Sequence, residues 1–247
     1  MIITEIGLNH MGDEVYAIEL VNKLIKTNVD GISFQIREPD FYKKYPNLLL
    51  NKNFYINIKN LIKKNNKYFG IALCDASEIS FFDDLEVDFF KIINRDINNF
   101  ELINKMLASK VKTIYLSTGL SDLNEIKNCL SNITENYSKK IILVHTQLDH
   151  SLNGVNLRSI EYLKSNFKLP VAFGLHSKKF EVMYMSLCYL PDGILFYIKG
   201  NNYEFHLDED HAVAVDLVLN LVNNLKKLPL AIGKLQKLKP SSPLDIL

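Results

Sequence analysis

The stretch MIITEIGLNHMGD, residues 1–13, joins a short apolar run to polar residues and then to an apparent helix start. The run Ile2–Ile6 is rich in β-branched residues, which predicts a strand. It carries Glu5, and Asn9 and His10 follow where the strand passes into a loop. Polar groups at a strand end are typical of α/β active sites, because function gathers on loops that a rigid sheet holds in place. An ordinary polar loop with capping residues is the alternative at this point.

Short apolar runs alternate with longer amphipathic stretches along the whole chain. The short runs are β-branched or aromatic and apolar on both faces, as buried parallel strands require. They are Ile2–Ile6, Gly31–Ile36, Phe69–Leu73, Phe89–Ile92, Thr113–Ser117, Ile141–His145, Val171–Gly174 and Gly193–Ile198. Between them, apolar residues recur with helical spacing. These stretches predict helices over Glu14–Thr27, Asp122–Ile133, Asn156–Phe167, Lys178–Leu190 and His211–Leu225, and Glu38–Asn51 is expected to be an extended loop.

Strict alternation of strand and helix predicts a (β/α)8 TIM barrel, an α/β fold in a single domain. An open doubly wound sheet is the alternative, but it would need fewer strands or a long break in the pattern. A chain of 247 residues with 47% hydrophobic content can bury one large core. We expect the barrel over residues 1–228 and a C-terminal tail over residues 229–247.

Charge and cysteine content narrow the functional class. The chain has 29 basic and 28 acidic residues, so its net charge of +1 gives no bulk attraction to nucleic acid or to an anionic membrane. Cys74, Cys129 and Cys188 are isolated, match no metal-ligand spacing and favour a reducing compartment. The sequence has no signal-peptide pattern and no apolar stretch long enough to span a bilayer. We expect a cytoplasmic protein that binds a small molecule.

Polar side chains gather at the predicted carboxyl ends of the strands, where a TIM barrel places its active site. Hydrogen-bond donors and cations dominate, which suits an anionic small molecule that bears hydroxyls. The candidates for substrate binding are Asn9, His10, Gln35, Arg37, Lys91, Asn94, Ser117, Thr118, His145 and His176. Any polar barrel mouth would show several such residues, so the set alone does not identify the substrate.

Five segments, in order along the chain, resemble the sialic acid synthase family. They are EIGLNHMGD, FQIRE, CDASEISFFDDLEVDFFKI, YLSTGLSDLNEI and VHTQLDHSLNGVNLRSIEYLK. Members of that family are (β/α)8 barrels that condense phosphoenolpyruvate with an N-acetylated amino sugar, with a divalent metal as Lewis acid. The resemblance implies a protein of nonulosonic acid biosynthesis in which Glu5 is the catalytic acid/base. It also implies that Lys91, Ser117 and Thr118 contact phosphate or carboxylate.

Departures from the family fall where its chemistry should lie. Ser33 replaces a phosphoenolpyruvate-binding lysine, and Lys178 stands where a metal-binding histidine follows the seventh strand. Phe196 and Ile198 take the places of a glutamate and a histidine that share one face of the eighth strand. We therefore predict that the family's metal site is lost and that no cofactor is bound.

Lys178 becomes a candidate catalytic residue, as a fixed cation in place of the metal. A buried lysine tends to lose its proton, so a carboxylate such as Glu5 would have to keep it charged. A metal site rebuilt around His176 is the alternative.

The C-terminal stretch AIGKLQKLKPSSPLDIL, residues 231–247, resembles the linker to the antifreeze-like domain that follows the barrel in the family. That domain completes the partner subunit's site in a swapped dimer, so the resemblance leaves a homodimer open. Two functions stay open as well. One is an altered or metal-independent synthase that uses phosphoenolpyruvate and an amino sugar. The other is a diverged barrel that binds a sugar or a partner protein without catalysis.

Overall fold

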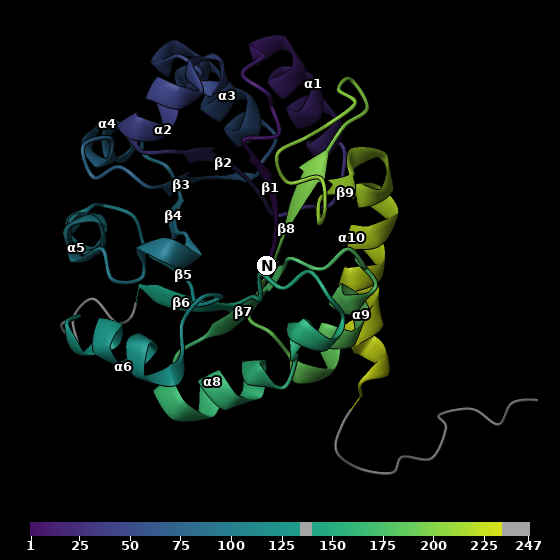
Figure 1. Ribbon diagram of the computed structural model, residues 1–247. Helices are drawn as coiled ribbons and strands as arrows, with labels where there is room; N and C mark the ends of the chain where they lie inside the picture. Colours follow the sequence, from purple (N-terminus) through teal and green to yellow (C-terminus); the bar gives the residue numbers. More distant parts are fainter. Residues whose placement is uncertain (134–139, 234–247) are drawn as a thin grey trace, which may run out of the picture.

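The computed structural model describes residues 1–133 and 140–233, and its strands form a closed parallel barrel. Strands β1 to β8 pair in chain order, and β1 also pairs with β8. Figure 1 looks down the barrel, with the strands around the axis and the helices in an outer ring. The strands are β1 Ile2–Gly7, β2 Gly31–Ile36, β3 Tyr68–Leu73, β4 Phe89–Ile92, β5 Thr113–Ser117, β6 Ile141–His145, β7 Val171–Leu175 and β8 Ile194–Lys199. The predicted single-domain TIM barrel is confirmed.

The helices agree with prediction less closely than the strands. They are α1 Glu14–Leu24, α2 Pro39–Lys44, α3 Lys52–Lys64, α4 Ile79–Asp84, α5 Phe100–Ala108, α6 Leu123–Ser131, α8 Ser159–Phe167, α9 Val182–Ser186 and α10 Val218–Lys227. The expected loop over Glu38–Asn51 is wrong, because it contains α2 and the 3-10 turn Pro46–Leu48. Both begin with proline, whose fixed φ suits the first helical position. None of the helices within residues 1–133 and 140–233 combines the length and the apolar character that a membrane span needs.

The C-terminal part also departs from expectation. The range predicted as one helix, His211–Leu225, contains β9 near its start. This strand, Val213–Ala214, pairs in parallel with the end of β8. Helix α10 starts only at Val218, and a 3-10 turn at Leu228–Ala231 follows it. Most of the predicted tail, residues 234–247, lies outside the described residues, as does the segment 134–139.

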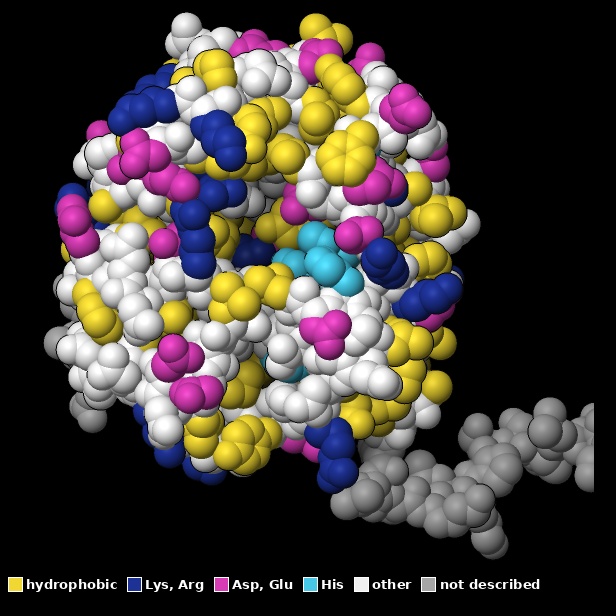
Figure 2. All heavy atoms as spheres, viewed as in Figure 1, with side chains coloured by type: hydrophobic (Ala, Val, Ile, Leu, Met, Phe, Trp, Pro, Cys, Tyr) yellow, Lys and Arg dark blue, Asp and Glu magenta, His cyan; other side chains and the backbone are white. Residues whose placement is uncertain are grey.

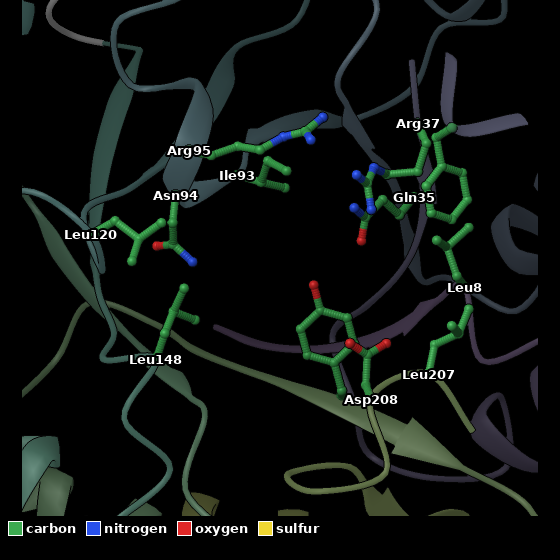
Figure 3. A pocket seen from close by; sticks show the side chains of 12 residues that line it. Leu8, Gln35, Arg37, Ile93, Asn94, Arg95, Leu120, Leu148, Leu207 and Asp208 are labelled. Atoms are coloured by element: carbon green, nitrogen blue, oxygen red, sulfur yellow. The ribbon is translucent and has the colours of Figure 1, made fainter. Parts of the chain in front are cut away.

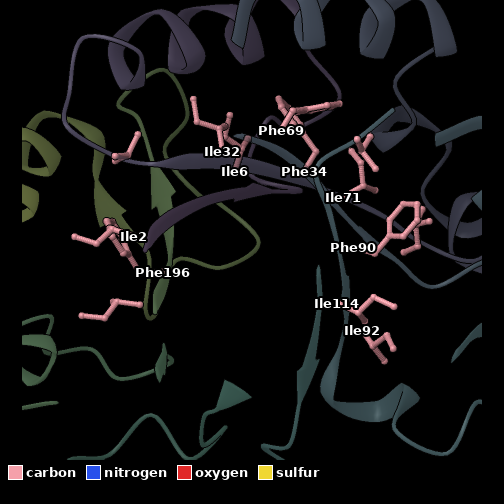
Figure 4. Packing of buried hydrophobic residues seen from close by; sticks show 14 of the residues in the cluster. Ile2, Ile6, Ile32, Phe34, Phe69, Ile71, Phe90, Ile92, Ile114 and Phe196 are labelled. Atoms are coloured by element: carbon pink, nitrogen blue, oxygen red, sulfur yellow. The ribbon is translucent and has the colours of Figure 1, made fainter. Parts of the chain in front are cut away.

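Two apolar layers hold the barrel together. Outward-facing strand residues such as Phe34, Phe90 and Phe196 pack against the helices, and Figure 4 shows part of this outer layer. Inside the barrel, a smaller cluster fills the amino-terminal half; its members are Ile3, Phe89, Tyr115, Val144, Ala172 and Leu195. Gly70 makes room for it, because a Cβ at that position would lie 2.0 Å from the Phe89 ring. The interior is therefore a packed core, and polar side chains follow only toward the carboxyl ends of the strands.

The register of β8 corrects one prediction about the site. Phe196 and Ile198 are fully buried in the outer layer, so the alignment that sets them against the family's glutamate and histidine is wrong. The alternation of side chains turns Tyr197 inward instead, and the parallel pairing places it beside Glu5. The inward-facing residues of β8 are one position away from those expected, and since side chains alternate along a strand, this exchanges its two faces.

Candidate functional site

A buried ion pair between Glu5 and Lys91 lies at the carboxyl end of the barrel. The Lys91 ammonium donates to both carboxylate oxygens, with Nζ 2.7 Å from Oε1 and 2.6 Å from Oε2. Each side chain is 4% exposed. The pair forms because β1 and β4 turn these two side chains into the barrel, just beyond the apolar cluster that fills its amino-terminal half. Two charges so far from water carry a large desolvation penalty, which is typical of a functional site.

Tyr197 packs against this ion pair. Lys91 Nζ lies 5.3 Å from the centroid of the Tyr197 ring, within the range of a cation–π contact. Burial, and then the negative charges of Glu5 and Asp208, raise the pKa of the Tyr197 hydroxyl well above its usual range. Gly7 permits this packing, because its φ of +58° and a Cβ 2.6 Å from the tyrosine ring would both oppose a larger residue.

A cavity of about 330 Å³ opens at the barrel mouth. Arg37 and Arg95 point toward it from one side, and Asp208 lies across from them (Figure 3). The lining residues are Leu8, Gln35, Arg37, Phe41, Ile93, Asn94, Arg95, Leu120, Leu148, Tyr197, Leu207 and Asp208. Cations face a carboxylate across this cavity, the amides of Gln35 and Asn94 add polar groups to its wall, and most of the remaining lining is apolar. Such a cavity can hold a small ligand that has an anionic end and hydroxyl groups.

Glu38 holds the two arginines at the cavity. Arg37 donates to both of its carboxylate oxygens, over 3.1 and 3.2 Å, and Arg95 contacts one of them as well. Burial acts to raise the pKa of Glu38, but the hydrogen bonds from Arg95 and Arg37 outweigh it and lower that pKa to about 2. Arg37 also stacks over Phe41, 4.2 Å from the ring centroid. The three charges together leave one positive charge toward the cavity.

Asp208, on the cavity wall, has a raised pKa. Burial, and then the negative charge of Glu5, raise the pKa of Asp208 to about 7, although Lys91 and Arg37 act against the rise. Its side chain is 24% exposed because it opens on the cavity. Asp208 therefore exchanges a proton near neutral pH, as an acid–base group must.

Three imidazole rings stack at the rim of the mouth. The His211 ring lies 4.5 Å from that of His176 and 5.1 Å from that of His150, and the neighbouring ring planes are nearly parallel. Figure 2 shows histidine side chains gathered beside the hollow. Burial, and then the neighbouring histidines and Lys91, lower the pKa of His211 to about 4 and that of His176 well below its usual range. The His211 and His176 rings are therefore neutral at pH 7.

The donor set of the mouth does not fit a divalent metal. The lone pairs of imidazole lie in the ring plane, so the nitrogens of stacked parallel rings do not converge on one ion. Throughout residues 1–133 and 140–233, no group of three or more His, Cys, Asp or Glu side chains is placed to hold a metal ion.

Four of the predicted substrate-binding residues lie at the cavity, and two more are buried at the end of β5. Gln35, Arg37 and Asn94 line the cavity, and Lys91 lies against Tyr197, which also lines it. Ser117 and Thr118 are buried at the end of β5, where the Thr118 hydroxyl donates to the Val144 carbonyl oxygen, 3.1 Å away.

Three other candidates make structural contacts. Asn9 donates to the Ile198 carbonyl oxygen, 2.9 Å away, and accepts from the backbone N–H of Asp208, 3.0 Å away. His10 is fully buried and accepts from the Gly12 N–H in a tight turn, and burial lowers its pKa to about 4. His145 lies on the helix side of β6, with Nε2 2.9 Å from the Val155 carbonyl oxygen. None of the three lines the described cavity.

Lys178 lies elsewhere than predicted. Its ammonium is at the outer rim, 63% exposed and 3.0 Å from Asp210, so Glu5 does not hold it. The cation beside Glu5 is Lys91. The expectation of a buried Lys178 is wrong because the loop after β7 turns outward before that residue.

Sequence reasoning missed Asp208 as a cavity residue, whereas it placed Arg95 and Tyr197 among the polar residues at strand ends without giving them a role. Asp208 stands in an acidic run, Asp208–Asp210, within a long loop after β8, which is the signal that could have pointed to it. The inward position of Tyr197 could be found only with the phase of β8 known.

A family model described as the NeuB family matches residues 20–237. The chain belongs to the NeuB family. It is 29% identical to an N,N'-diacetyllegionaminic acid synthase of Campylobacter jejuni, over 72% of this chain and 61% of that protein. It is also 28% identical to an uncharacterized protein of Methanocaldococcus jannaschii, over 100% of this chain and 76% of that protein.

The barrel has a close structural counterpart. A crystal structure of N-acetylneuraminic acid (sialic acid) synthetase from Leptospira borgpetersenii, in complex with citrate, superposes with a TM-score of 0.87 and 23% identity. The match covers 98% of this chain and 87% of that one. The predicted resemblance to sialic acid synthases is thus confirmed as membership of the NeuB family. The chain spans about three fifths of the length of the Campylobacter synthase, 61%.

Proposed function

We propose that this NeuB-family protein condenses phosphoenolpyruvate with the aldehyde of an N-acetylated amino sugar, as a cytoplasmic enzyme of nonulosonic acid biosynthesis that needs no divalent metal. The observation that carries the proposal is the buried Glu5–Lys91 pair beside Tyr197, at the edge of a cavity that Arg37 and Arg95 line. The phosphoryl and carboxylate groups of phosphoenolpyruvate need cationic hydrogen-bond donors, and Arg37, Arg95 and Lys91 supply them at this mouth, although Glu38 and Glu5 offset part of their charge. The match to legionaminic acid synthase supports the amino-sugar class of acceptor.

Each residue has a part that its contacts support. Lys91 and Arg37 would bind the carboxylate and the phosphoryl group, because charge-assisted hydrogen bonds to such groups are the strong ones. Glu5 would position the Lys91 ammonium, which donates to both of its carboxylate oxygens. Gln35 and Asn94 would bind hydroxyl groups of the acceptor from the cavity wall.

The test is phosphate release from phosphoenolpyruvate with N-acetylmannosamine or a panel of other N-acetylated sugars. We expect release that EDTA does not abolish and that Lys91→Met removes. Lys63→Ala is the matched control, since Lys63 pairs with Asp88 ahead of β4, away from the mouth. Loss of release in EDTA would refute metal independence. Loss in Lys178→Ala would restore the fixed-cation prediction for that residue.

No release with any sugar of the panel would refute the condensation. It would favour the diverged barrel that binds a sugar or a partner protein without catalysis.

A further inference from the structure

Among the described residues, Asp208 is the one carboxylate that lines the cavity at the barrel mouth. Charged and titratable groups from several elements face it. Glu5 on β1, Lys91 on β4 and Arg37 after β2 all act on its charge. Tyr197 of β8 lies beside it, and His211 of its own loop lies 3.8 Å away.

The backbone of Asp208 is fixed although its loop is long. The backbone N–H of Asp208 donates to Asn9 Oδ1 over 3.0 Å. The side-chain amide of Asn9 in turn donates through Nδ2 to the Ile198 carbonyl oxygen over 2.9 Å. Asn9 is fully buried, so it joins the end of β1, the end of β8 and the Asp208 loop in one rigid unit. A carboxylate held in this way keeps its position relative to the Glu5–Lys91 pair, as catalytic geometry requires.

We propose that Asp208 is the acid–base residue that protonates the aldehyde oxygen of the acceptor. This inference rests on the proposed function. It assigns the proton transfer at the acceptor to Asp208, which lines the cavity. Glu5 stays paired with Lys91. Asp208 then performs both the acid step and the base step, in place of the acid/base role that the resemblance implies for Glu5.

The proton balance of the reaction closes on Asp208. As C3 of phosphoenolpyruvate bonds to the aldehyde carbon, the carbonyl π electrons move to the oxygen, which takes the proton of Asp208. Water then adds to the cationic C2, and its released proton returns to the Asp208 carboxylate. The C2–O bond to the phosphoryl group breaks, and the departing phosphate takes the proton of the new C2 hydroxyl as the ketone forms. No oxidant, reductant or further reactant is needed.

The ionisation of Asp208 supports this role. Its pKa of about 7 leaves a large fraction protonated at neutral pH, ready to donate, and makes its conjugate base strong enough to take a proton from attacking water.

The test compares Asp208→Asn, Asp208→Glu and the neighbouring control Glu209→Gln, whose carboxylate pairs with Lys199 away from the cavity lining. We expect Asp208→Asn to lower kcat by about 100-fold or more, the usual contribution of a positioned general acid. Its Kd for phosphoenolpyruvate, measured by calorimetry, should change by less than about threefold. The fall of kcat above pH 7 should vanish in Asp208→Asn and shift in Asp208→Glu, which a merely structural role would not cause.

Two results separate the possible failures. If the wild type releases phosphate while Asp208→Asn keeps its kcat and its pH profile, the role of Asp208 is refuted and the condensation stands. If the wild type releases none with any acceptor, both proposals fall. Should Asp208→Asn not fold in a thermal melt, an unshifted pH profile in Asp208→Glu refutes the role.

Discussion

Removing one partner of the Glu5–Lys91 pair should destabilise the fold strongly. In Glu5→Gln the Lys91 ammonium stays 4% exposed but loses the carboxylate that lies 2.6 Å away. An uncompensated buried charge of this kind costs about 3–5 kcal/mol of unfolding free energy. Lys91→Met leaves the Glu5 carboxylate in the same position and should cost a similar amount. The double variant removes both charges, so we expect it to be nearly as stable as the wild type.

Equilibrium urea unfolding, followed by far-UV circular dichroism, measures these free energies for the wild type, both single variants and the double variant. Two single losses of about 3–5 kcal/mol each and a double variant near the wild type give a coupling energy of about 6–10 kcal/mol. The control cycle uses Glu101 and Lys105, an exposed pair one helical turn apart on α5, whose coupling should be only about 0.3–0.5 kcal/mol. Equal coupling energies in the two cycles, or single variants that lose less than about 1 kcal/mol, would refute the reasoning.

Further predictions concern the surroundings of the pair. The folded state holds the proton of Asp208 up to a pKa of about 7, whereas the unfolded chain releases it near pH 4. The free energy of unfolding of the wild type should therefore fall by up to about 4 kcal/mol as pH rises from about 4 to 7. In Asp208→Asn, urea unfolding across that range should lack this loss; an unchanged pH dependence would contradict the assignment. Asn9→Ala should cost about 2–4 kcal/mol, because two buried backbone groups lose their partner. Hydrogen exchange should then quicken at Asp208, and unaltered exchange would argue against the bridging role. Gly7→Ala should lower Tm, because it combines positive φ with a clash against Tyr197; an unchanged Tm would show that the ring can move aside.

The strands could be predicted because their sequences are apolar on both faces and too short for buried helices. Their phase could not always be predicted. In β8, every residue from Ile194 to Ile198 is apolar or aromatic, so hydrophobicity does not distinguish the inner face from the outer one. The pairing of β8 with β7 and β1 fixes which face Phe196 takes, and those partners are far away in the sequence. The same lack of contrast concealed the inward position of Tyr197.

The sequence predicted where the candidate site lies, but only some of the residues that line it. Strand ends carry polar residues for two different reasons, and a sequence does not separate them. Gln35 faces the cavity, whereas Asn9 binds a backbone carbonyl of β8 and His145 binds one of the 3-10 turn Asn153–Val155. Lys91 was among the candidates, but its pairing with Glu5 joins residues 86 positions apart and depends on the closed barrel.

The closure of the barrel between its first and eighth strands has a consequence for how the protein matures. Glu5 meets Tyr197 only across this seam, where Ile2–Glu5 pair with Ile194–Tyr197. Asn9 bridges the same seam. Contacts between such distant parts of a chain are among the slowest to form. A nascent or half-folded chain therefore has no assembled site, and ligand binding could serve as a direct reporter of completed folding.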